Sequence, residues 1–215
     1  MRPMARVLPA VICVGACSIV AAVAWGAQTL TFEARLQPDK LGSPTNVTVN
    51  GKFTSTSGGQ PSPITNVTAY LPAGVKLDLR GLGTCTSAKL QAAGPSGCPA
   101  NSRAGFGGGV GLLELAKELI HEPYTIDIFL GPSEDGHRVF LAYVFAKSPA
   151  LIELVLKATE IHAPKPYGIG FSIEVPPIPT LPGASNASVE SAFVTFGANN
   201  ISYFQTIDGK KTSCT

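Results

Sequence analysis

The nine residues RVFLAYVFA, at positions 138–146, are apolar or aromatic at every position after the first. A strand with one exposed face alternates apolar and polar side chains, whereas a strand covered on both faces is apolar throughout. A continuous apolar run of this length therefore predicts a central strand, with other parts of the chain packed over each of its faces.

Shorter stretches on both sides of this run alternate apolar and polar residues with a period of two, which is typical of strands with one buried face. In LTFEARL, at 30–36, the leucines, the phenylalanine and the alanine lie on one face, and the threonine, glutamate and arginine lie on the other. The same alternation recurs at 46–53, 67–71, 126–130, 152–158, 169–175 and 192–196.

Clusters of Gly, Pro, Ser and Asn separate these stretches and predict frequent turns. The pattern favours an all-β fold, and we expect an immunoglobulin-like antiparallel β-sandwich. Only two segments have helical character. Residues 87–93 predict one short helical turn, and LLELAKELI, at 112–120, fits either a helix or a long edge strand.

Cys85 and Cys98 lie 13 positions apart, around the expected helical turn and a Gly-Pro pair. In an oxidising compartment such neighbours usually pair, and closing a loop of this length is worth about 3 kcal/mol of stability. A zinc site would need C-x-x-C or histidine partners at ligand spacing, and the sequence has neither. We therefore predict a disulfide-closed excursion, with Cys214 left unpaired.

The N-terminus places Arg2 and Arg6 before an uncharged apolar run at 7–27, which is the layout of a secretory signal peptide. Small residues at 22–24 offer a cleavage site. Two alternatives remain: an uncut membrane segment, because a helix of this length reaches about 31 Å, and a lipoprotein signal in which Cys17 would be acylated. We expect residues 1–27 to be a signal peptide or an N-terminal membrane segment, and the protein to be secreted or at the cell surface.

The remaining residues, 28–215, are long enough for a single β-sandwich domain. Removing Arg2 and Arg6 from the 16 basic residues leaves 14, equal to the 14 acidic residues. Binding to phosphate backbones needs clustered Lys and Arg, and the only adjacent basic pair lies at 210–211. We expect no nucleic-acid partner.

Five glycines stand at 105, 107, 108, 109 and 111. The dinucleotide-binding pattern G-x-G-x-x-G fits none of their registers, because Val110 or Leu112 stands where its last glycine would be, and no P-loop lysine follows. Small residues here instead indicate a backbone that bends or passes close to a neighbouring strand.

The segment LPAGVKLDLRGLGTCTSAKLQAAGPSGCPANSRAGFGGG, at 71–109, resembles a recurring segment of secreted actinobacterial β-sandwich proteins, and so do the later VPPIPTLPG and SVESAFVTFG. The resemblance implies that Cys85 and Cys98 are the paired cysteines of that segment. Members of the group continue past this point with further strands, so a truncated C-terminus would explain the odd Cys214. The motifs indicate no activity.

The three histidines, His121, His137 and His162, stand apart, and no hydrolase, metalloprotease or calcium-loop motif occurs. His121 and Glu122 are adjacent, so in a strand they would point to opposite faces. We expect no catalytic, cofactor-binding or metal-binding residues. The sequence favours an exported, non-catalytic structural or adhesive protein with an unknown cell-envelope or extracellular partner, touching a membrane only through an uncleaved N-terminus. The alternative is a secreted hydrolase acting on envelope glycans or lipids.

Overall fold

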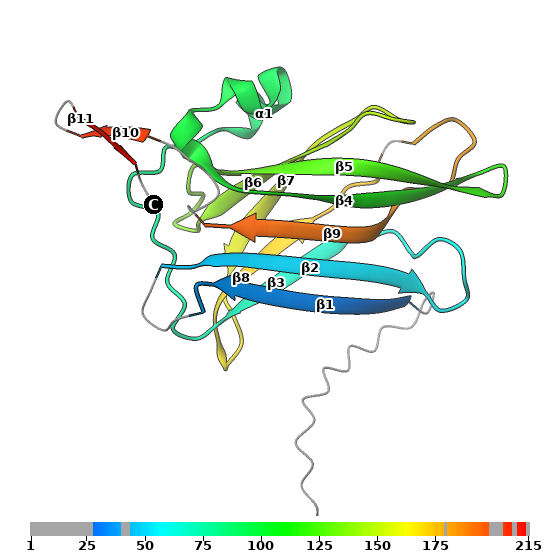
Figure 1. Cartoon of the computed structure of the whole chain (residues 1–215), viewed down its shortest axis with the longest axis horizontal. Coiled ribbons are helices and arrows are strands. Elements are labelled where there is room, and N and C mark those ends of the chain that lie inside the picture. Colours follow the sequence, from blue (N-terminus) through cyan, green and yellow to red (C-terminus); the bar gives the residue numbers. More distant parts are fainter. Residues whose placement is uncertain (1–27, 40–43, 179, 198–203, 208–209, 214–215) are drawn as a thin grey trace, which may run out of the picture.

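A computed structural model of the chain describes residues 28–39, 44–178, 180–197, 204–207 and 210–213 (Figure 1). The predicted signal segment at 1–27, including Cys17, and the predicted unpaired Cys214 lie outside the described residues. No helix among the described residues is long and apolar enough to cross a membrane.

Most of the described chain belongs to one antiparallel sheet of 9 strands in the order β1-β2-β9-β4-β5-β6-β7-β8-β3. The strands are β1 (Gln28–Gln37), β2 (Asn46–Ser55), β3 (Asn66–Pro72), β4 (Arg103–Leu115), β5 (Glu118–Leu130), β6 (Val139–Ala146), β7 (Ile152–Ile161), β8 (Tyr167–Glu174) and β9 (Ser188–Phe196). A separate hairpin pairs β10 (Phe204–Ile207) with β11 (Lys210–Ser213). The predicted all-β class and antiparallel pairing are confirmed.

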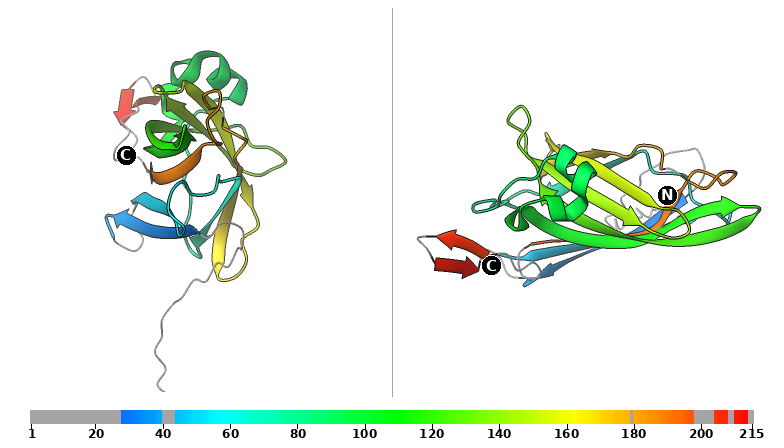
Figure 2. Two further views of the ribbon diagram at one scale, coloured as in Figure 1. Left: turned by 90° about the vertical axis from the view of Figure 1, so that its right-hand side faces the viewer. Right: turned by 90° about the horizontal axis from the view of Figure 1, so that it is seen from above.

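The sheet is strongly curled, so that its two halves face each other across the inner face (Figure 2). Strand β6 lies three strands away from β9. In a flat sheet the two strands would be about 14 Å apart. Their side chains would stand perpendicular to the sheet and would not meet. The ring centroids of Phe140 on β6 and Phe196 on β9 are nevertheless only 6.2 Å apart, and Phe171 on β8 approaches Phe140 from the other side at 5.5 Å. Side chains of strands that are not neighbours therefore pack against each other across the inner face of one continuous sheet.

Strand β6 is the central strand that the run at 138–146 predicted. On its outer face, Val139 and Leu141 are each only 1% exposed and pack in one cluster with Leu90. On its inner face, Phe140 is buried in a second cluster with side chains of β5 and β8. An apolar side chain is favourable on each face because both faces are covered.

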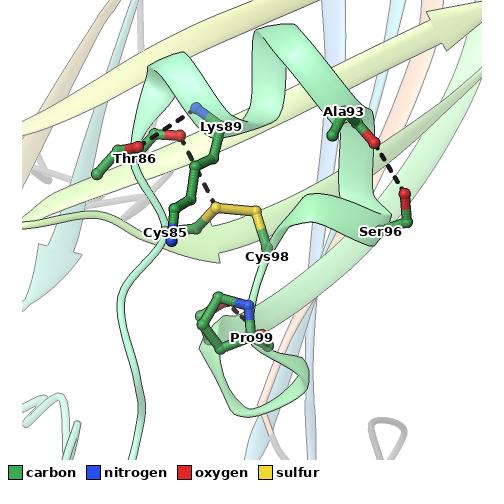
Figure 3. Close-up of a disulfide and its surroundings, with 8 residues drawn as sticks. Cys85, Thr86, Lys89, Ala93, Ser96, Cys98 and Pro99 are labelled. Atoms are coloured by element: carbon green, nitrogen blue, oxygen red, sulfur yellow. Dashed lines mark hydrogen bonds between the residues drawn. A yellow bond between two sulfur atoms is a disulfide. The ribbon is translucent and has the colours of Figure 1, made fainter.

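The outer cover is the predicted disulfide-closed excursion, which holds α1 (Ser87–Ala93) and a 3₁₀ turn at Gly94–Gly97. A second 3₁₀ turn, at Ala100–Ser102, follows Cys98 and leads into β4. Figure 3 shows the disulfide between Cys85 and Cys98, whose Cα atoms are 5.3 Å apart. The backbone N–H of Cys85 donates to the carbonyl of Leu130 at the end of β5, at 2.8 Å. The Thr86 hydroxyl caps α1 by accepting from the N–H of Lys89 at 3.3 Å. The prediction of one short helix in a disulfide-closed excursion is confirmed.

Residues 112–120 form neither a helix nor one long edge strand, but the tip of the β4–β5 hairpin. The hairpin turns at Ala116 and Lys117, whose φ angles are 53° and 70°. Two residues with positive φ are typical of the tight turn that matches strand twist, although Asn-Gly is the usual sequence there. Pairing from Gly105 to Leu115 against β5 overrides the helix propensity of this segment.

The glycines of β4 let two strands approach closely, as the sequence predicted. A Cβ atom on Gly107 would clash with the backbone carbonyl of Phe193 on β9, and one on Gly105 would lie 2.6 Å from the carbonyl oxygen of Thr195. The inner face therefore has no side chains along this part of β4. The rings of Phe140 and Phe196 can meet over this gap, which permits the tight curl.

Candidate functional site

We call the inner face of the curled sheet the trough, and most of its side chains are apolar. One row across the sheet, read from the pairing registers, runs through Ala34, Val49, Val194, Gly107, Ile126, Val144 and Leu154. The middle of the trough is filled by packed side chains such as Ile128 and Leu130, which are 4% and 8% exposed.

The trough is open along its β1 edge. Among the described strands, β1 has a neighbour on one side only, and all ten of its residues are exposed. Its inward-facing side chains Leu30, Phe32 and Leu36 are 54%, 63% and 49% exposed. The opposite edge strand, β3, also leaves Val67 partly exposed. Burial of a side chain of this size stabilises by about 1.5–3 kcal/mol. A partner that covered the β1 edge would therefore gain binding free energy from these side chains.

A buried carboxyl group lies on the same inner face, near the turn of the β4–β5 hairpin. Glu122 is only 3% exposed, and its Oε1 accepts a hydrogen bond from the N–H of Ala150 at 3.1 Å. Its Oε2 has no hydrogen-bond partner among the described residues. Burial raises the pKa of Glu122, and the Ala150 N–H offsets only part of this effect.

The raised pKa makes stability depend on pH at this position. Folding favours the protonated carboxyl, so the wild type loses stability as the pH rises from the unfolded value, about 4.3, through the folded value. Glu122→Gln does not titrate, and its stability relative to the wild type should therefore increase over the same pH interval. Urea unfolding at several pH values measures this difference.

Glu118→Gln is the matched control, because Glu118 is exposed on the same strand. Its stability should follow that of the wild type at every pH. A constant difference between the wild type and Glu122→Gln across the pH range would contradict the predicted role of burial at Glu122.

The residues singled out from the sequence as potential acid–base groups do not converge. His121 and Glu122 point to opposite faces, as predicted, and His121 Nδ1 lies 2.9 Å from Glu190 Oε2 on β9. Pairing of β4 with both β5 and β9 brings these two residues together from 69 positions apart, which no local pattern shows. His137 lies in an exposed turn, where its backbone pairs with that of Glu134, and His162 is exposed in a loop.

Two close ion pairs link neighbouring strands. Arg138 donates from Nε and a terminal nitrogen to both carboxylate oxygens of Glu160, each at 2.7 Å, and this lowers the pKa of Glu160. Arg103 on β4 pairs with Asp127 on β5. Both pairs connect neighbouring segments of the sheet.

A depression of about 360 Å³ lies on the outer face near the β1 edge, with Glu33, Lys52, Ser191 and Phe193 in its lining. Another, of about 370 Å³, lies between α1 and the outer face of β6 and β7, with Gln91, Tyr143 and Glu153 in its lining. Within the described ranges, no group of three or more His, Cys, Asp or Glu residues is placed to hold a metal ion.

Comparisons with protein families, curated proteins and solved structures find no match for this chain. The open β1 edge and the buried Glu122 are therefore the features from which a function can be inferred.

Proposed function

We propose that this chain is an exported, non-catalytic protein of the cell envelope or extracellular space, with a structural or adhesive role. The observation that carries the proposal is the row formed by Leu30, Phe32 and Leu36 on β1, which are 49–63% exposed. Soluble proteins rarely leave large apolar side chains along an unpaired strand edge unless something binds there. Such an edge can take an extended segment of a partner as an added strand.

Two features support the proposed location. Cys85 and Cys98 form a disulfide. Disulfides form and persist mainly in oxidising compartments outside the cytosol. The apolar run at 7–27 has the layout of an export signal, and it would hold the protein at a membrane if it is not removed. The balanced charge of residues 28–215 gives no basis for a nucleic-acid partner.

The test compares the full chain with the triple variant Leu30→Thr/Phe32→Thr/Leu36→Thr, in which threonine preserves strand propensity. Binding to isolated envelopes of the producing cells is measured by co-sedimentation. We expect the triple variant to bind at least about tenfold more weakly, because three exposed apolar contacts are lost. The control is Thr29→Ser/Thr31→Ser, which alters the opposite face of the same strand and should leave binding unchanged.

Circular dichroism should show that the triple variant remains folded, because β1 is exposed along its whole length. Envelope binding that survives the triple substitution would count against the β1 edge as the adhesive surface. A wild-type chain that does not bind envelopes or any extracellular material would overturn the adhesive role.

Glu122 favours a second candidate function, a secreted hydrolase acting on envelope glycans or lipids. A carboxyl group whose pKa is raised by burial in an apolar environment can serve as a general acid. The test is hydrolysis of envelope polysaccharides and lipid esters by the wild type, with Glu122→Gln as the control. Turnover that disappears in Glu122→Gln would establish the hydrolase and displace the non-catalytic role, whereas no turnover, or turnover equal in both proteins, would rule Glu122 out.

A further inference from the structure

The free edge of β1 lacks the features that usually prevent strands from pairing between molecules. All ten residues of β1 pair with β2 in one register without a bulge. The strand contains no proline and no lysine, which are common protections of an edge. Its outer face carries one acidic and one basic residue, Glu33 and Arg35, which pair with each other at 2.8 Å and remain well exposed.

We propose that the partner of this edge is a second copy of the same chain, which pairs with it antiparallel through β1 about a two-fold axis at Ala34. The inference rests on the proposed function, since it names the partner of the same β1 surface. Two antiparallel β1 strands related by a two-fold axis keep their inner faces on the same side of the combined sheet. Paired residues of an antiparallel pair lie on the same face of the sheet. The axis must therefore pass between the two copies of one residue, which face each other across the interface.

The charges of β1 select the register. An axis at Glu33 would place two carboxylates directly opposite each other, and an axis at Arg35 would do the same with two guanidinium groups. An axis at Ala34 places Glu33 of each copy opposite Arg35 of the other, twice in one interface. Directly opposed opposite charges stabilise a strand pair, and like charges destabilise it.

The inner face agrees with the same register. With the axis at Ala34, Phe32 of one copy faces Leu36 of the other, again twice. These side chains are 63% and 49% exposed in the single chain, so pairing would cover them. The two troughs would become one continuous apolar surface. An axis at Phe32 also pairs apolar side chains, but it leaves Glu33 opposite a threonine and gains nothing from the charges.

A charge-swap experiment tests the register. The full chain, Glu33→Arg, Arg35→Glu and the double variant Glu33→Arg/Arg35→Glu are compared by analytical ultracentrifugation over a range of concentrations. Each single variant opposes like charges at both cross-copy positions, so we expect its dimer dissociation constant to rise about ten- to thirty-fold. The double variant restores complementary charges and should dimerise like the wild type.

Mixing the two single variants provides a second, independent readout. Each variant repels its own copies, but the two are complementary to each other in the register centred on Ala34. Native mass spectrometry of the mixture should therefore show mainly heterodimers. Arg80→Glu is the control, because Arg80 and Asp78 form a similarly exposed pair, separated by two positions, outside β1. It should not change dimerisation.

Three outcomes would overturn the inference. A wild-type chain that stays monomeric throughout the concentration range has no such interface. Long polymers would indicate pairing of β1 with the β3 edge of another copy, which cannot close. A dimer that is insensitive to both single variants uses another register or another surface. Envelope binding that depends on Leu30, Phe32 and Leu36 in a monomeric chain would retain the proposed function and reject only the second copy as partner.

Discussion

Leu141→Ala should lower the free energy of unfolding by about 2–5 kcal/mol, among the largest effects of any single substitution in this protein. Leu141 is 1% exposed and lies on the outer face of β6 in the cluster that contains Leu90 and Cys85. The sheet on one side and the disulfide-closed excursion on the other leave no solvent path to this side chain. Truncation therefore leaves a cavity that the surroundings can fill only partly. Equilibrium unfolding in urea gives the difference directly.

Leu151→Ala is the matched control, because the same atoms are removed from a side chain that is 68% exposed. Its effect should stay within about 0.5 kcal/mol, the usual range for surface substitutions. Equal effects at the two positions would contradict the placement of β6 as the central strand covered on both faces.

Replacement of both cysteines in Cys85→Ala/Cys98→Ala should cost about 3 kcal/mol, the entropic value for a loop of this length. Besides the disulfide, the excursion is held on the sheet by the hydrogen bond from the Cys85 N–H to the Leu130 carbonyl and by the packing of Leu90. Without the cross-link, α1 can leave the outer face and expose Leu90, which is fully buried in the native protein. Thermal and urea unfolding of the double variant measure the loss.

A reducing agent provides the control for the disulfide. It should destabilise the wild type by a similar amount and leave the double variant unchanged, because the variant has no Cys85–Cys98 bond to reduce. Equal stability of wild type and double variant, with no effect of the reducing agent on either, would show that the excursion is held by packing alone.

The pattern of residues along the chain predicted several elements because their signals are local. The apolar run at 138–146 identified β6, and alternation at 30–36 identified β1 and the face on which Phe32 lies. The spacing of Cys85 and Cys98 indicated their disulfide, since the two cysteines flank a short turn. The glycines of β4 indicated a close strand approach without identifying β9 as the strand.

The same local reasoning did not resolve 112–120, where helix-forming residues occupy a hairpin tip. Helix propensity is worth less than about 1 kcal/mol per residue, and the pairing of β4 with β5 outweighs it. Nor did it find the contact between His121 and Glu190, because the two residues come together only when β9 inserts between β2 and β4.

The sequence by itself determined the antiparallel strands with one apolar face, the buried central strand and the disulfide-closed excursion. These features follow from periodicity and spacing, which are properties of residues close together in the chain. Only the tertiary structure decided that the strands form one curled sheet and that β1 lies at its open edge. It also decided that Glu122 is buried with no described residue as a hydrogen-bond partner for Oε2. These features depend on the order of strands in space. That order is set by contacts between distant segments, and it determines which apolar residues are covered and which stay available for binding.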